Sequence, residues 1–501
     1  MGLFQNHMMA AAAAATADTG YTIDNSCRFN INDTAYLARD VATTLSNKFT
    51  YSFWVKRCTF GTYQYIVTWR DGSGAGSPYG MIQFNNDDTL SPFEYDTASS
   101  ANYAVYTVTD AVFRDPSAWY HIVVNFDYTR STSDRVRVYA NGTLQTFGTN
   151  ENSASAGTPQ SQATGSDGNF LGVAKLYNAS TQMGDFYMAE VHLVSDAALA
   201  ASEFGETNSN GVWVPKEYSG SYGDEGHFLD FESSGDLGND VSGNNNDFTS
   251  SGLAAADQME DTPTNNQITY NPLNNQRSGG EVKDGNLVYN GPGTRTLISL
   301  SANLPPTGKY AVAFKTDKVS TNAGWDFGIT KSNNTNFGDA AGSNEDVGAN
   351  DGLNMSPSSS DLAIWDYVTT GDIDPSLPIT TSDEFWMAVD MATGKCFLGI
   401  YDASATSMIW VAADAGVDGN PATGANPTTT ISAMIGSTDY VFAAAGSKGD
   451  ENLTLMKSAD ISGTIPTGYT YFENVADFPT PAVTDPSEYY QTGPEYAGNA
   501  S

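Results

Sequence analysis

Two acidic residues, Asp230 and Glu232, come nearest in this sequence to a catalytic pair. Side chains two residues apart on a β-strand point to the same face, so a strand here would hold both carboxylates together. A retaining glycosidase uses two carboxylates about 5–5.5 Å apart, one of them with a raised pKa. The alternative interpretation of this pair is an exposed strand end without chemistry.

Oxygen ligands suitable for a hard cation crowd the loop 236–247. The four candidates are Asp236, Asp240, Asn244 and Asp247, and carboxylate and amide oxygens are the ligands that calcium prefers. Their spacing differs from that of an EF-hand loop. Asp and Asn also populate metal-free turns for conformational reasons. Calcium is therefore the one candidate cofactor, and a metal-free turn is the alternative.

A sugar site usually combines an aromatic platform with amide and carboxylate groups. The candidates for such a site are Tyr79, Asn85, Asp87, Tyr95 and Tyr103. The alternative is that these tyrosines lie at the edge of a core or in a contact between subunits.

Several other classes of function are disfavoured. Four histidines, at 7, 121, 192 and 227, and three cysteines, at 27, 58 and 396, form no Cys/His cluster, so zinc and triad chemistry are not expected. An odd, sparse set of cysteines indicates folding in a reducing cytoplasm. The net charge of −36 repels phosphate backbones, which argues against nucleic-acid binding. No stretch approaches the roughly 20 apolar residues that span a bilayer.

The elements that would position these residues are predicted to be antiparallel strands. β-branched and aromatic runs alternate with Gly, Asn, Asp and Ser clusters, as at 49–57, 119–127 and 135–142. The last of these ends on Asn141-Gly142, a hairpin signal. Helix is expected only in short pieces, such as 197–204 and the Ala-rich leader.

A chain of 501 residues is too long for one core. We predict an all-β protein with two sandwiches, arranged as an N-terminal anchor (1–20), a first sandwich (21–205), a connector (206–270), a second sandwich (271–475) and an extended tail (476–501).

The strands 49–57, 119–127 and 135–142, in this order, resemble a laminin-G-like domain of the concanavalin A-like superfamily. The segments 308–315, 324–330 and 384–399 resemble a SPRY-like sandwich. The superfamily includes β-glucanases, but a third carboxylate after Glu232 is missing because Ser233 and Ser234 follow. We therefore expect no enzyme activity.

The whole chain also resembles virion structural proteins of marine tailed bacteriophages, described as lectin-like or fibre-associated. The resemblance rests on the leader 1–7 and on the segments 26–30, 53–57, 218–223, 261–266 and 420–427. It implies a virion protein that is attached to the particle and contacts the host surface, but it does not identify a ligand. We expect a protein that is assembled in the bacterial cytoplasm and binds host-surface glycans as a tail-fibre or tail-associated adhesin. The alternatives are a capsid decoration or head-fibre protein without glycan specificity, and a glycan depolymerase.

The leader is expected to bind another virion protein or a second copy of this chain, giving a homo-oligomer. Leu3, Phe4, Met8 and Met9 are apolar and too few to build a core alone, and the run 10–15 is all Ala. Burying each large side chain in a partner's groove would contribute about 1.5–3 kcal/mol.

Deleting residues 2–15 should therefore leave both sandwiches folded but abolish incorporation into the particle. Circular dichroism of the purified variant controls for folding, and quantitative immunoblotting of purified particles measures incorporation. Normal occupancy of the truncated chain would show that the leader is not the anchor.

Overall fold

The structure of the chain is a computed structural model. It describes residues 20–41, 45–70, 79–95, 103–152, 170–175, 184–209, 211–274, 280–291, 296–319, 325–332, 353–357, 362–366, 370–372, 379–412, 418–446 and 452–474. The leader residues Leu3, Phe4, Met8 and Met9 and the tail 476–501 lie outside these ranges.

The first sandwich consists of two antiparallel sheets, here called sheet I and sheet II. The strands of sheet I, in spatial order, are β10 (Thr143–Leu144), β9 (Val136–Ala140), β8 (Trp119–Asp127), β3 (Lys48–Arg57), β13 (Phe186–Ser195), β1 (Ser26–Phe29) and β18 (Gln258–Met259), and β16 (His227–Leu229) also pairs with β13. The strands of sheet II are β11 (Phe147–Asn152), β7 (Tyr103–Thr109), β6 (Leu90–Tyr95), β5 (Tyr79–Phe84), β4 (Gln64–Arg70), β12 (Phe170–Val173), β2 (Tyr36–Asp40) and β17 (Thr249–Ser251).

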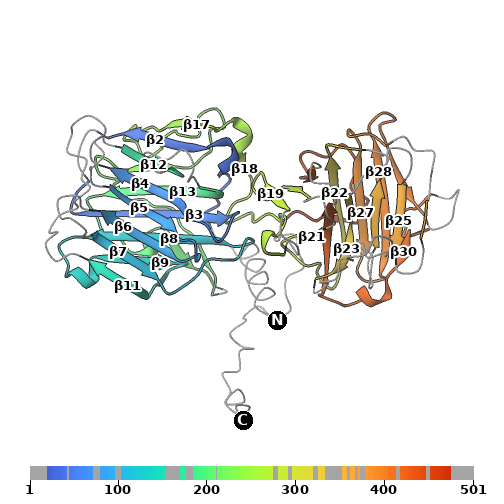
Figure 1. Ribbon diagram of the computed structural model, residues 1–501, viewed down its shortest axis with the longest axis horizontal. Coiled ribbons are helices and arrows are strands. Elements are labelled where there is room, and N and C mark those ends of the chain that lie inside the picture. Colours follow the sequence, from blue (N-terminus) through green and yellow to red (C-terminus); the bar gives the residue numbers. More distant parts are fainter. Residues whose placement is uncertain are drawn as a thin grey trace, which may run out of the picture.

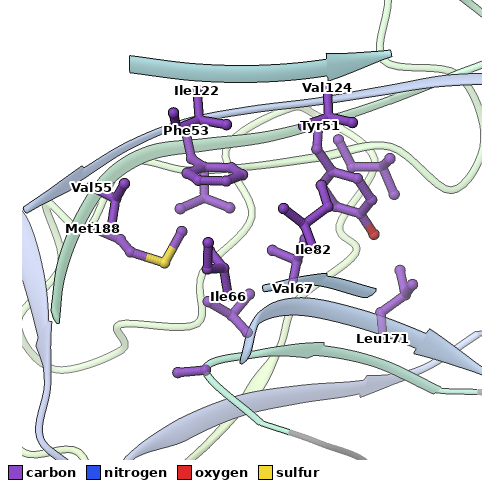
Figure 2. Close-up of a cluster of buried hydrophobic side chains, with 14 of the residues drawn as sticks. Tyr51, Phe53, Val55, Ile66, Val67, Ile82, Ile122, Val124, Leu171 and Met188 are labelled. Carbon is purple, nitrogen blue, oxygen red and sulfur yellow. The ribbon is translucent and has the colours of Figure 1, made fainter. Parts of the chain in front are cut away.

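Alternating side chains of the two sheets fill the space between them. On β3, Tyr51, Phe53 and Val55 point inward, as the period of two requires. They meet Ile66 and Ile82 of sheet II, and Figure 2 shows these side chains converging between the sheets. The predicted hairpin is confirmed, because β9 and β10 pair across Asn141 and Gly142, whose φ angles of 46° and 75° suit a two-residue turn.

The second sandwich has the same construction. In spatial order, sheet III contains β19 (Glu281–Lys283), β20 (Val288–Asn290), β32 (Asn452–Leu455), β22 (Lys309–Thr316), β27 (Glu384–Asp390), β28 (Lys395–Asp402) and β29 (Ser407–Val411), with β30 (Thr429–Thr430) beside β28 and β33 (Thr470–Tyr471) parallel to β22. Sheet IV contains β21 (Thr296–Ser299), β31 (Tyr440–Gly446), β23 (Trp325–Lys331), β24 (Leu353–Pro357), β25 (Leu362–Asp366) and β26 (Thr370–Asp372). The core of the second sandwich includes Phe314 and Phe385 of sheet III and Phe327 and Phe442 of sheet IV.

The segment 206–270, expected to be a connector, contributes strands to the first sandwich. Within it, β16 pairs with β13, β17 with β2 and β18 with β1. A separate small hairpin joins β14 (Gly205–Thr207) to β15 (Trp213–Pro215). The first sandwich therefore takes strands from both sides of residue 205.

The helix expected at 197–204 is reduced to the single 3₁₀ turn η3 (Ala201–Glu203). The hydroxyl of Thr50 donates to Ala197 O and accepts from Leu199 N, and the Asn125 amide donates to Leu199 O. These bonds hold the preceding backbone against sheet I instead of in a helix. The other described helical pieces are also 3₁₀ turns: η1 (Ile31–Asp33), η2 (Thr132–Asp134), η4 (Ala255–Asp257), η5 (Pro272–Asn274) and η6 (Ser432–Met434).

The outer faces of sheets I and III are covered by other parts of the chain. Val123 and Val194 of sheet I pack against Ala201 and Phe204. On sheet III, Trp386 packs in a cluster with Met456, Tyr469 and Tyr471 from the last described segment. These covers are made of chain segments that follow the strands they protect.

A polar joint links the two sandwiches, which lie side by side in Figure 1. Lys56 of β3 and Asp261 are each 1% exposed and form an ion pair of 2.7 Å. Lys56 Nζ also donates to Gln267 O at 2.6 Å, and Trp119 Nε1 donates to Asp261 Oδ1 at 2.9 Å. A buried ammonium and a buried carboxylate are thereby paired and further hydrogen-bonded, as burial of charge requires.

The turn 284–287 between β19 and β20 completes the joint from the second sandwich. Tyr187 of β13 donates its hydroxyl proton to Gly285 O at 2.7 Å, and Arg28 of β1 donates to Asp284 O. Gly285 has φ 65°, and a Cβ there would lie 2.0 Å from the Tyr187 hydroxyl oxygen. Only glycine fits this contact.

Both ends of the described chain return to this joint. Near the start, Ile23 N donates to Thr264 Oγ1 at 3.0 Å. Near the end, Ile268 N donates to Glu473 O at 2.7 Å. The described chain therefore begins and ends beside residues 264–268.

We predict that Asp261→Asn lowers the free energy of unfolding by about 3–5 kcal/mol, because it leaves the Lys56 ammonium buried without its counter-charge. The matched control is Asp134→Asn at the Arg137–Asp134 pair, whose side chains are 35% and 45% exposed. That change should cost less than about 1 kcal/mol. Urea unfolding followed by fluorescence measures both, and equal losses would contradict the prediction.

Candidate functional site

The predicted carboxylate pair does not share a strand face, so that expectation is wrong. Strand β16 ends at Leu229, and Phe231 has φ 60°, which turns its 2%-exposed ring into the core. Glu232 N donates to Asp230 Oδ1 at 3.1 Å, forming a local turn. Burial raises the pKa of Asp230, and the charge of Asp230 raises the pKa of Glu232. The two groups form a turn and not a strand-borne pair.

A buried Glu–His–Tyr cluster lies close by and was not found from the sequence. Glu190 has φ 51° at a bulge where the pairing of β13 with β3 shifts register. Its Oε2 accepts from the Tyr21 hydroxyl at 2.9 Å and lies 3.3 Å from His192 Nε2. His192 Nδ1 lies 3.0 Å from the Tyr222 hydroxyl oxygen. Glu190 and His192 are 7% and 3% exposed, so this cluster is an internal polar network.

The predicted calcium ligands mostly bind the protein itself. Asp240 accepts backbone N–H groups of Phe228, Ser242 and Asn246. Burial acts to raise the pKa of Asp240, but these hydrogen bonds outweigh it and lower the pKa. Asp247 accepts from Asp240 N at 2.9 Å.

The other two predicted ligands have similar roles. Asp236 Oδ1 accepts from Gly238 N at 3.3 Å, and the Asn244 amide donates to the carbonyls of Gly223 and Gly226. Within the described ranges, no three His, Cys, Asp or Glu side chains gather in a way that could hold a metal ion. The hydrogen bonds of these four side chains stabilise the loop.

The predicted sugar-binding residues separate into two groups at opposite ends of β5. Asn85 and Asp87 lie in the β5–β6 turn, where both side chains bond to Thr89. The bond from Thr89 lowers the pKa of Asp87. Tyr79 begins β5, six residues before Asn85, or roughly 20 Å along an extended strand. Asn85 and Asp87 therefore build a turn and do not share a site with Tyr79.

The tyrosines, in contrast, do come together. Tyr79 lies opposite Tyr95 in the β5–β6 ladder, with ring centroids 5.5 Å apart. The backbone of Tyr103 lies opposite Tyr95 on β7, and its side chain is outside the described part. Tyr79 and Tyr95 are both half-buried on the outer face of sheet II.

Two further aromatic residues extend this group across the sheet. Phe93 lies opposite Tyr106, with ring centroids 6.2 Å apart, and 5.7 Å from the Tyr79 ring. We call Tyr79, Phe93, Tyr95 and Tyr106 the aromatic strip. The strip runs across β5, β6 and β7, and each of its four residues is half-buried. Alternation in the sequence places each ring on an outer face, but only the register brings them side by side.

A lysine and two more rings lie beyond β4 on the same sheet. Lys175 Nζ lies 3.6 Å from the centroid of the Tyr36 ring and 5.7 Å from that of Phe170. The Phe170 ring lies over Gly172, because a Cβ there would be 2.6 Å from it. Phe170 is opposite Arg70, and Arg70 is opposite Tyr79. One cross-strand row therefore connects this lysine-bearing group to the aromatic strip.

The three described histidines are packed inside the protein. His121 Nδ1 accepts from Trp213 Nε1 at 2.9 Å, and its Nε2 lies 2.9 Å from the Ser52 hydroxyl oxygen. Burial lowers the pKa of His121 to about 3. Burial likewise lowers the pKa of His227 to about 3. All three imidazoles are buried, and they serve the packing of the interior.

Comparison with known families identifies the first sandwich. Residues 30–203 match the family model Laminin_G_3, described as Concanavalin A-like lectin/glucanases superfamily. A comparison with curated protein sequences finds no match. Within the described residues, no helix has the length and apolar character needed to cross a membrane.

Several solved structures are similar. Domains LG4-5 of the mouse laminin α1 chain are 8% identical over 90% of this chain and 97% of that one, with a TM-score of 0.29. The SAP-like pentraxin of Limulus polyphemus is 16% identical over 36% of this chain and 78% of its own, with a TM-score of 0.27. The TRIM65 PSpry domain is 9% identical over 38% and 93% of the two chains, also with a TM-score of 0.27.

The chain is thus an all-β protein with multiple antiparallel sheets and a concanavalin A-like, laminin-G-like domain. Lectin-like is the class that this domain defines. The virion role stays a prediction.

We predict that acid destabilises the protein through its buried histidines. A histidine with an unfolded pKa near 6.5 and a folded pKa of about 3 binds its proton only after unfolding in this window. Its contribution to stability is therefore complete above pH 6.5 and is lost as pH falls toward 3. The slope is up to about 1.4 kcal/mol per pH unit for each histidine.

Urea unfolding of wild-type protein and of His121→Phe, between pH 6.5 and 5, measures this effect. The variant should be less stable at pH 7, because two polar contacts are lost, but its stability should fall less steeply with acid. Identical slopes would show that His121 is not held neutral.

Proposed function

We propose that this chain is a non-enzymatic, glycan-binding virion protein that acts as an adhesin in a tail fibre or tail-associated appendage. The aromatic strip is the observation that carries the binding part of this proposal. Sugar rings stack on aromatic faces, and binding sites combine such platforms with a few polar groups.

The outer face of sheet II is the best-suited surface of the first sandwich. Its four strip rings keep part of their surface exposed, whereas the outer face of sheet I carries buried Val123 and Val194 under Phe204. Strand spacing of about 4.8 Å places successive rings at regular intervals across the sheet. An extended saccharide lying across the strands could contact several of them at once.

The proposed partners are other virion proteins, reached through the leader, and further copies of the same chain. The three cysteines, Cys27, Cys58 and Cys396, are free and buried, which is compatible with assembly in a bacterial cytoplasm. A capsid decoration or head-fibre protein without glycan specificity is the rival proposal. A depolymerase is less well supported, because Asp230 and Glu232 lie in a turn after β16.

A glycan array with host-derived polysaccharides should show saturable binding by the wild-type protein. Tyr79→Ala and Tyr95→Ala should each weaken the binding by about tenfold, a loss of about 1.4 kcal/mol. Tyr63→Ala is the matched control, because Tyr63 is 44% exposed and outside the strip. It should bind like the wild type.

Two results would overturn the proposal. Absence of binding to every host glycan would favour a purely structural role. Release of reducing sugar by the wild type, lost in Glu232→Gln, would establish a depolymerase.

A further inference from the structure

The lysine-bearing end of sheet II points to the charge of the ligand. We propose, on the basis of the glycan-binding function above, that the outer face of sheet II selects carboxylated polysaccharides, with Lys175 as the residue that recognises the carboxylate. The aromatic strip would hold the sugar rings, and Lys175 would bind an acidic sugar at the β2–β12 end.

Lys175 is positioned by contacts that do not neutralise its ammonium group. Its carbonyl accepts from the Thr68 hydroxyl at 2.7 Å, which fixes the backbone after β12. Its ammonium lies over the rings of Tyr36 and Phe170. Within the described residues, no carboxylate lies within ion-pair distance of it. A cation held over aromatic rings is attracted by their negative faces and keeps its charge.

Lys175 offers a local positive charge on a chain that is acidic overall. The chain has 22 basic and 58 acidic residues, so its overall field repels polyanions. Most described basic side chains of the first sandwich are paired, such as Arg28 with Asp257 and Lys56 with Asp261. Lys175 is half-buried on the sheet face that carries the strip. Arg70, between Phe170 and Tyr79 in the same row, is only 3% exposed, so Lys175 is the residue assigned to the carboxylate. The Lys175 ammonium would therefore attract an acidic ligand, while the net negative charge of the rest of the chain would repel it.

The ion pair with Lys175 also predicts how binding depends on salt. The pair between Lys175 and a ligand carboxylate would be short-range and half-buried, so salt would screen it little. The repulsion between the ligand and the acidic surface acts over longer distances, so salt would screen it first. The affinity for a neutral polysaccharide stacked on the strip would depend little on salt, because neither interaction involves it.

Three polysaccharides that contain uronic acids, here called polyuronates for brevity, test the proposal: alginate, polygalacturonate and hyaluronan. Each is compared with its carboxyl-reduced form, which keeps the sugar chain and removes the charge. Isothermal titration of the full chain should give binding to at least one polyuronate that is roughly three- to tenfold tighter than to its reduced form, the scale of one partly desolvated charge pair. Lys175→Met should abolish this difference, and Lys175→Arg should keep it.

Lys48→Met is the matched control, since Lys48 is a 43%-exposed lysine of sheet I, and it should leave the difference unchanged. Thermal unfolding of each variant checks that the fold is intact. Tyr95→Ala should weaken binding of both forms alike.

The outcomes separate this inference from the function on which it rests. Equal affinity for a polyuronate and its reduced form, or an unchanged difference in Lys175→Met, would overturn the charge selection and leave glycan binding intact. Failure to bind all six polymers would overturn the charge selection, and the host-glycan array then decides glycan binding separately.

Discussion

Every strand of a sheet has two faces, and each apolar face needs a cover. This constraint organises the whole chain. The inner faces of sheets I and II cover each other, as do those of sheets III and IV. The outer face of sheet I takes the segment around Phe204, and that of sheet III takes the segment 456–471. The rings of the aromatic strip on sheet II stay half-buried, so the candidate site follows from the same rule that builds the core.

Charge burial is the second constraint, and it determines where one sandwich ends and the next begins. Lys56 belongs to a strand whose inward residues are apolar, but its own side chain points outward. Asp261, Gln267 and Trp119 surround it. The chain between the two sandwiches is therefore fixed by the hydrogen bonds and the ion pair that surround the buried Lys56 ammonium. A purely apolar interface could slide, whereas paired charges and directed hydrogen bonds define one geometry.

The fold was predictable from the sequence to the extent that its strands are regular. Strand β8 covers 119–127 as predicted, β3 begins one residue early at Lys48, and the Asn141-Gly142 turn is where the hairpin signal placed it. The site was predictable only in part. Tyr79 and Tyr95 were found, but Phe93, Tyr106 and Lys175 were not, because only cross-strand register makes them neighbours.

Other misses have local causes. Asp230 and Glu232 fit a strand by spacing, but the positive φ of Phe231 buries that ring and breaks the alternation. Asn85, Asp87 and Asp240 have the right chemistry for ligands, yet their oxygens accept hydrogen bonds from neighbouring groups of the protein. The donors are the Gln83 amide, Thr89 N and Phe228 N. Composition cannot distinguish an oxygen that faces a ligand from one that closes a turn. The role of 206–270 was hidden because β16, β17 and β18 are two or three residues long.

Ile23 and Glu473 both hydrogen-bond to residues 264–268, so both ends of the described chain lie at the joint between the sandwiches. Residues 264–268 are therefore hydrogen-bonded both to the opening segment of the first sandwich and to the closing segment of the second. A disturbance of this short stretch would thus reach both sandwiches, although each has its own core.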